Sequence, residues 1–146
     1  MRTRVLPVLF AFLACAAIAQ AAGLNPAIVE PAIAISVSLA NDTMTDVQAK
    51  AASIETEAAK LTPPAPKVVA AAKALHGAAK IAAARTAFGT LNEEIVKYMK
   101  TNKLTLDPST RIAVCPMVDK PWLQKEAAIR NPYYGKEMLG CGSFEK

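Results

Sequence analysis

The sequence predicts an all-α protein: a small antiparallel bundle of about four helices, with an irregular C-terminal cap that contains two cysteines. Three observations lead to this prediction. Apolar residues between Ala27 and Lys103 recur at spacings of three and four, as they do on one face of a helix. Alanine is abundant in the same stretch, and small side chains let helix axes approach closely. Beyond Lys103, four prolines interrupt the chain before a long helix can form.

The N-terminus has the pattern of a secretory signal peptide. Two arginines precede an acid-free apolar run from Val5 to Ile18, and small residues follow up to Ala21. The run is shorter than the roughly 20 apolar residues that a membrane span needs. Cleavage is therefore expected after Ala21, which leaves residues 22–146 as one periplasmic or secreted domain without a transmembrane segment. The alternative is a lipoprotein that is lipidated on Cys15.

The first predicted helix includes a segment whose pattern is ambiguous. Strict alternation from Ile33 to Leu39 favours a strand, whereas the spacing of Ile28, Ala32, Ile35 and Leu39 favours a helix. An isolated strand would leave its backbone groups without partners, and the neighbouring segments are helical. We therefore predict a helix here.

Three further helices are expected before the cap. The clearest has an apolar face at steps of three and four, formed by Met44, Val47, Ala51, Ile54, Ala58 and Leu61. Asn41-Asp42-Thr43 offers N-cap oxygens for it, and Pro63-Pro64 prevents its continuation. The next helix is predicted from about Pro66 to Gly77, and the last from near Ala79 to Met99.

Residues 104–146 form the predicted cap. They contain both cysteines of the mature chain, the only tryptophan and two of the three tyrosines. This apolar and aromatic content is enough to pack against the bundle, so the cap is expected to be ordered. One short helix is predicted within it, from about Trp122 to Ile129.

Composition argues against several classes of function. Signal cleavage removes two arginines and no acid, so the formal net charge falls from +5 to +3. No basic run alternates with aromatic residues, which argues against a nucleic-acid interface. His76 is the only histidine, so catalytic triads and histidine-rich zinc sites are excluded. No glycine-rich phosphate loop is present, and an enzyme is not expected.

Two sulfur-bearing segments are the candidate for chemistry. Cys115-Pro116-Met117 and Met138-Leu139-Gly140-Cys141-Gly142 each place a thiol within four residues of a thioether. Soft sulfur donors favour Cu(I) and similar ions, so Cys115, Met117, Met138 and Cys141 are candidate ligands, with His76 as a further one. Two cysteines in an exported protein also commonly form a disulfide, and methionines commonly fill cores. The spacing leaves both interpretations open.

The segment Asn131-Pro132-Tyr133-Tyr134-Gly135 predicts a turn, since Asn-Pro initiates turns and glycine accepts a positive φ. Its aromatic rings are also placed to shield the sulfur residues from water. The residues expected to shape the site are Pro116, Trp122, Asn131, Pro132, Tyr133, Tyr134, Gly135 and Gly142.

The order of these motifs resembles a family of small exported bacterial domains of unknown function. The family pattern is Cys-Pro-Met, Trp-Leu, Asn-Pro-Tyr-aromatic-Gly and Met-Leu-x-Cys-Gly, which this chain matches from Cys115 to Gly142. The chain departs from the pattern in having a short insert between Met117 and Trp122. Such domains also occur attached to membrane-fusion subunits of copper and silver efflux pumps. The resemblance implies binding of Cu(I) or Ag(I) in heavy-metal buffering or efflux, with a membrane-fusion subunit or another periplasmic metal-handling protein as partner.

Overall fold

The computed structural model describes residues 22–145, so the predicted signal peptide, including Cys15, lies outside the described residues. Four helices come first: α1 (Pro26–Ala40), α2 (Val47–Ala58), α3 (Pro66–His76) and α4 (Ile81–Thr101). The later elements are β1 (Arg111–Cys115), β2 (Lys120–Gln124), the 3-10 helix η1 (Gly135–Met138) and β3 (Ser143–Phe144). The fold is predominantly helical, as predicted, but the prediction of an all-α protein is wrong because the three strands form a sheet.

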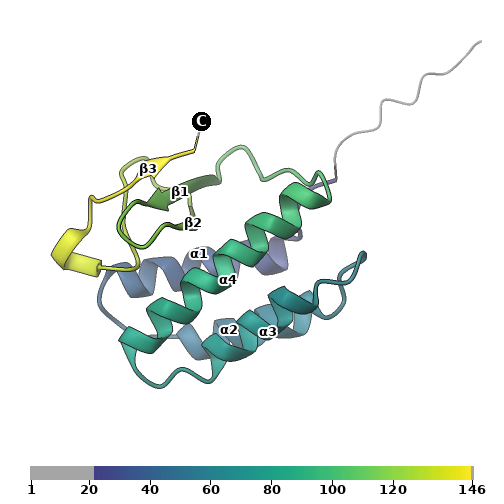
Figure 1. Cartoon of the computed structure of the whole chain (residues 1–146), viewed down its shortest axis with the longest axis horizontal. Coiled ribbons are helices and arrows are strands. Elements are labelled where there is room, and N and C mark those ends of the chain that lie inside the picture. The colour runs from purple at the N-terminus through teal and green to yellow at the C-terminus, as the bar shows by residue number, and fades with distance from the viewer. Residues whose placement is uncertain (1–21, 146) are drawn as a thin grey trace, which may run out of the picture.

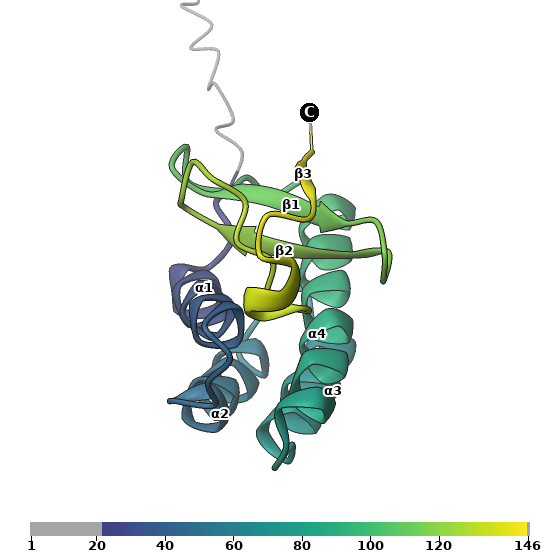
Figure 2. The ribbon, with the colours of Figure 1, turned by 90° about the vertical axis from the view of Figure 1, so that its left-hand side faces the viewer.

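The sheet closes a side of the bundle that the helices leave open (Figure 1). Helix α2 packs against α1 and α3, and α3 packs against α4. Helices α1 and α4 make few direct contacts, and strand β2 packs against both of them. Figure 2 shows the sheet on one side of the helices, nearest α1 and α4. The C-terminal part of the chain therefore completes the core.

Helix α1 confirms that the ambiguous segment is helical. Asn25 caps its first turn, because its side-chain oxygen accepts a hydrogen bond from the amide of Ala27 at 2.9 Å. Pro26 follows in the first helical position, where its missing N–H costs nothing. The residues of the predicted apolar face, Ile28, Ala32, Ile35 and Leu39, are all buried.

Helix α2 buries the predicted face but begins later than expected. Val47, Ala51, Ile54 and Ala58 are buried in the core. The predicted cap at residues 41–43 is wrong, because the N-cap position is Asp46, whose side chain makes no capping hydrogen bond. Thr43 instead accepts a hydrogen bond from the amide of Thr45 in the preceding turn. Helices α3 and α4 lie where the sequence predicts them.

The three strands form an antiparallel sheet in the order β2-β1-β3. Val114 of β1 pairs with Pro121 on one side and with Ser143 on the other. Strand β2 is at the edge of the sheet, which is where a proline without an N–H is tolerated. A short turn, in which Asp119 has a φ of 50°, connects β1 to β2.

The predicted helix from Trp122 to Ile129 is wrong. Trp122 lies in β2, paired with Ala113, and the residues after Gln124 form an irregular loop. The prediction failed because β2 is stabilised by its partner strand and by burial against α1 and α4, and neither is visible in the local pattern. The short helical element of the cap is η1, which directly follows the tyrosine turn.

Candidate functional site

The pairing of β1 with β3 brings the two sulfur-bearing segments together. Val114 pairs with Ser143 in an antiparallel register. Continued by one residue, this register sets Gly142 opposite Cys115, and Cys141 directly precedes Gly142 in the chain. The two cysteines therefore lie on neighbouring segments at one end of the sheet.

The two cysteines are free thiols that are buried to different extents. Cys115 ends β1 and is completely buried, on the same strand face as Ala113. Cys141 is partly buried, and its amide donates a hydrogen bond to the carbonyl of Met138 at 3.0 Å. This turn keeps Met138 and Cys141 on one compact segment. Within residues 22–145, no disulfide joins the cysteines.

The two methionines differ in their access to solvent. Met117 lies in the turn between β1 and β2, and 61% of its surface is exposed. Met138 ends η1 and is partly buried. Met117 follows Cys115 by two residues, so an exposed thioether and a buried thiol lie close together along the chain. Of the four predicted sulfur ligands, the register brings together the chain at Cys115 and the chain beside Cys141, whereas Met117 and Met138 are placed only by their positions along the chain, two residues after Cys115 and three residues before Cys141.

Asn131 holds the cysteine segment against the tyrosine turn. Its side chain is fully buried and donates to the carbonyl of Cys141 at 2.7 Å, while its side-chain oxygen accepts from the amide of Tyr133 at 2.8 Å. Its own amide donates to the carbonyl of Leu139 at 2.7 Å. Gly135 closes the turn with a φ of 58°, as predicted, and donates to the carbonyl of Asn131. One buried amide therefore positions both segments.

Three aromatic rings pack together in the part of the core that contains Cys115. Tyr133 lies between Trp122, with ring centroids 5.9 Å apart in an edge-on arrangement, and Phe88, with centroids 6.1 Å apart. Burial raises the pKa of the Tyr133 phenol, and the nearby Cys115 and Glu93 raise it further. Tyr133 is therefore neutral at physiological pH. Cys115, Trp122 and Phe88 are all completely buried in the same core.

Arg85 of α4 connects the tyrosine turn to the end of α1. It donates to the carbonyls of Pro132 at 3.0 Å and Leu39 at 2.9 Å, and to the carboxylate of Asp42 at 2.6 Å. Asp42 also accepts a hydrogen bond from the amide of Lys136 at 3.2 Å. These two donors, the Arg85 side chain first, lower the pKa of the Asp42 carboxyl. Sequence reasoning missed this pairing because no local spacing connects residues so far apart.

Gln124 is a second structural residue that sequence reasoning missed. It is buried, and its side-chain oxygen accepts from the indole N–H of Trp122 at 2.9 Å. Its side-chain amide donates to the carbonyls of Glu126 and Ala128, at 2.9 Å and 2.8 Å. A glutamine in the first turn of a predicted helix gave no signal of this role. The contacts shape the loop that leads to the tyrosine turn.

His76 lies apart from the sulfur residues. It ends α3, is about half exposed, and its Nδ1 is 3.4 Å from a carboxylate oxygen of Glu55 on α2. Helix α3 packs against α2 and α4 rather than against the sheet. Among the described residues, no group of three or more His, Cys, Asp or Glu side chains is arranged to hold a metal ion.

Comparisons with protein-family models, with curated proteins and with solved structures found no match to this chain. In the part of the chain that the structure describes, none of the helices combines the length and the apolar character needed to cross a membrane.

Proposed function

We propose that this protein binds Cu(I) or a similar soft ion such as Ag(I) outside the cytoplasm, and buffers it or hands it to an efflux component. The proposed ligands are Cys115 and Cys141, with Met117 and Met138 as thioether donors. The observation that carries the proposal is the β1–β3 pairing, which brings two thiols from distant parts of the sequence to neighbouring positions.

The donor set fits a soft monovalent ion better than zinc or calcium. Thiolates and thioethers favour Cu(I), whereas zinc favours cysteine with histidine, and calcium requires oxygen ligands. His76 lies elsewhere, beside Glu55.

The unequal exposure of the donors suits a carrier. Cys115 is buried, and Met117 is exposed at the turn two residues later. A carrier must release its cargo to a partner, and ligand exchange is easier when at least one donor faces solvent. Met117 is the donor that a partner protein would reach first, whereas Cys115 would hold the ion in a dry environment.

Titration of the reduced protein with Cu(I), in anaerobic competition with a chromophoric chelator, tests the proposal. We expect one ion per chain. The double substitution Met117→Leu with Met138→Leu should weaken binding at least about tenfold, since even outer partners of a metal ion contribute factors of about ten to one hundred. Met44→Leu with Met99→Leu is the matched control, because it removes two thioethers from the helical part of the protein. Equal affinities for the two double variants would contradict the four-sulfur site.

The alternative function is a non-enzymatic interaction module in which a Cys115–Cys141 disulfide staples the cap and the cap surface binds a partner protein. The same neighbouring positions support it, because a disulfide requires Cα atoms within about 7 Å. Thiol counting on protein isolated from the exported fraction distinguishes the two functions. Complete oxidation that resists mild reductant favours the staple. Two thiols that become reactive after denaturation or treatment with a copper chelator favour the metal site.

A further inference from the structure

Cys141 is the accessible thiol of the cysteine pair. It is partly buried and lies between Gly140 and Gly142, whereas Cys115 is completely buried at the end of β1. Gly140 is exposed, and a β-carbon on it would meet no atom within 4 Å. A dissolved reagent can therefore approach Cys141 from the side of Gly140, but it cannot reach Cys115 while the protein is folded.

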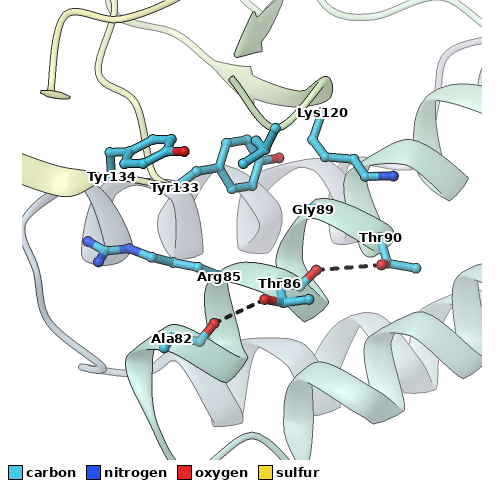
Figure 3. A pocket seen from close by; sticks show the side chains of 9 residues that line it. Ala82, Arg85, Thr86, Gly89, Thr90, Lys120, Tyr133 and Tyr134 are labelled. Atoms are coloured by element: carbon cyan, nitrogen blue, oxygen red, sulfur yellow. Dashed lines mark hydrogen bonds between the residues drawn. The ribbon is translucent and has the colours of Figure 1, made fainter. Parts of the chain in front are cut away.

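The groove beside the tyrosine turn does not provide another route to Cys115. It has a volume of about 480 Å³ and lies between α4 and the turn (Figure 3). Tyr133 and Gly89 both line it and are packed closely together, because a β-carbon on Gly89 would lie 3.4 Å from the Tyr133 ring. None of the four sulfur residues lines the groove. Of these two approaches, only the one at Gly140 leads to a thiol.

Backbone contacts hold Cys141 beside the end of β1. Its amide donates to the carbonyl of Met138 at 3.0 Å, and its carbonyl accepts from the side chain of Asn131 at 2.7 Å. The β1–β3 register sets Gly142 opposite Cys115, and the Cα atoms of facing residues in antiparallel strands are about 4.5 to 5.5 Å apart. Cys115 is the only other thiol among the described residues. A disulfide formed between Cys141 and an incoming compound therefore has one protein thiol beside it.

The segment around Cys141 has the freedom that a bond to Cys115 requires. A disulfide needs Cα atoms within about 7 Å and a defined torsion about the S–S bond. Gly140 has open space around it, and glycine reaches backbone conformations that other residues rarely adopt. Small rotations at Gly140 can therefore bring the Cys141 side chain towards Cys115 while β1 stays in the core.

We propose that Cys141 is the entry point of a thiol–disulfide exchange in which Cys115 is the resolving thiol. The substrate class is a small peptide disulfide, because a partly buried thiol is reached more easily by a small molecule than by the rigid surface of a folded protein.

The exchange takes place in two steps. The Cys141 thiolate attacks one sulfur of the incoming disulfide, whose S–S bond breaks, and the first leaving thiolate takes up the proton that Cys141 lost. The Cys115 thiol then attacks the sulfur of Cys141, the mixed disulfide breaks, and the second leaving thiolate takes up the proton of Cys115. In total, the two protein thiols are oxidised by two electrons to one disulfide, and the peptide disulfide is reduced to two thiols.

The exchange also releases a bound soft ion, and this part of the inference rests on the proposed function. Thiolates bind Cu(I), and a disulfide has no thiolate to offer. Oxidation therefore removes both cysteine ligands at once, while copper stays Cu(I), because the electrons go to the peptide disulfide. Reduced peptide thiols reverse the exchange and restore the site.

Oxidised glutathione tests the exchange on the reduced, metal-free protein, with intact mass spectrometry as the readout. Cys115→Ala should end as a stable adduct with one glutathione on Cys141. Cys141→Ala should react at least about tenfold more slowly, since its remaining thiol is buried. The wild type should end as an internal disulfide without glutathione. In urea that unfolds the protein, the two variants should react at equal rates, which is the control for intrinsic reactivity.

Rapid quenching of the wild-type reaction gives a second measurement that needs no substitution. Peptide mapping of the first adduct should find glutathione on Cys141. A first adduct on Cys115, equal rates for the two folded variants, or a wild type that keeps its glutathione would each overturn the proposal.

Cu(I) separates this inference from the proposed function. The ion should slow the reaction of the wild type with oxidised glutathione about tenfold when it fills about nine-tenths of the sites, and the oxidised protein should lose its Cu(I) binding. If the exchange proceeds as described but Cu(I) does not slow it, the exchange stands and the metal function is refuted.

Discussion

A β-carbon on Gly142 would lie 2.7 Å from Cη2 of Trp122 and 3.0 Å from the carbonyl oxygen of Val114. The φ of Gly142 is 143°, which residues with a side chain rarely adopt. The segment after Cys141 can therefore enter β3 only because residue 142 has no side chain. This close packing on Trp122 is what allows β3 to pair beside Cys115.

Gly142→Ala is expected to lower the free energy of unfolding by about 1 to 3 kcal/mol, because it combines overpacking with backbone strain. Urea denaturation followed by the fluorescence of Trp122 measures the change. Gly140→Ala is the matched control, since a β-carbon there meets no atom within 4 Å, and its effect should stay within about 0.5 kcal/mol. Similar losses in both variants would show that the contact with Trp122 is unimportant.

Asn131→Ala should destabilise the protein by about 2 kcal/mol or more, because it leaves the buried amide of Tyr133 and carbonyl of Cys141 without their partners. Asn131→Asp keeps the acceptor for Tyr133 but places an oxygen against the carbonyl of Cys141. It should therefore raise the reactivity of the Cys141 thiol towards a thiol reagent, through loosening of residues 138–141. An unchanged rate of modification in Asn131→Asp would contradict the positioning role of the amide.

The contribution of Asp42 to stability should depend on pH. Its folded pKa lies below the ordinary value of 3.8, so its stabilising effect is complete above that pH and is lost as the pH falls through the lower folded value. Asp42→Asn should therefore be less stable than the wild type near about pH 6, and the difference should shrink below about pH 4. Urea denaturation across this range measures it. Asp119→Asn, which removes an acid that makes no salt bridge among the described residues, is the control for the loss of one negative charge.

The first described residues should also contribute to stability. Leu24 is buried and its amide donates to the carbonyl of Thr105 at 2.8 Å, while the carbonyl of Ala22 accepts from the amide of Thr105 at 3.0 Å. A chain that starts at Asn25 should lose about 2 to 4 kcal/mol relative to one that starts at Ala22, because a buried leucine and two backbone hydrogen bonds are removed. Thermal unfolding of the two chains measures this difference in stability, and equal midpoint temperatures would contradict the prediction.

The helices were predictable because their signals are local. The apolar face of α2 and the proline that begins α3 are visible within one or two turns of sequence, and both appear in the structure. The start of α2 was not predictable, because Asp42 pairs with Arg85 rather than capping the helix. A contact between distant residues overrode the local capping signal.

The sheet was not predictable in the same way. Strands β1 and β3 are separated by the tyrosine turn, and the two residues of β3 become a strand only beside β1. Pro121 and Trp122 gave no local sign of a strand, because β2 is stabilised by β1 and by burial on α1 and α4. The four sulfur residues were identified from their chemistry, but their relative positions depend on this pairing.

The sequence by itself determined the helical half, the turn at residues 131–135 and the choice of sulfur residues as the candidate site, because each depends on periodicity, turn chemistry or residue type over a short span. Only the tertiary structure decided that the cap is a sheet, that Cys115 is buried while Met117 is exposed, and that Cys141 lies near Cys115. The physical reason is that strand pairing and burial are set by partners distant in sequence. Gly142 is an example. Its lack of a side chain is visible in the sequence, but the close approach of Trp122, which leaves no room for a side chain, is not.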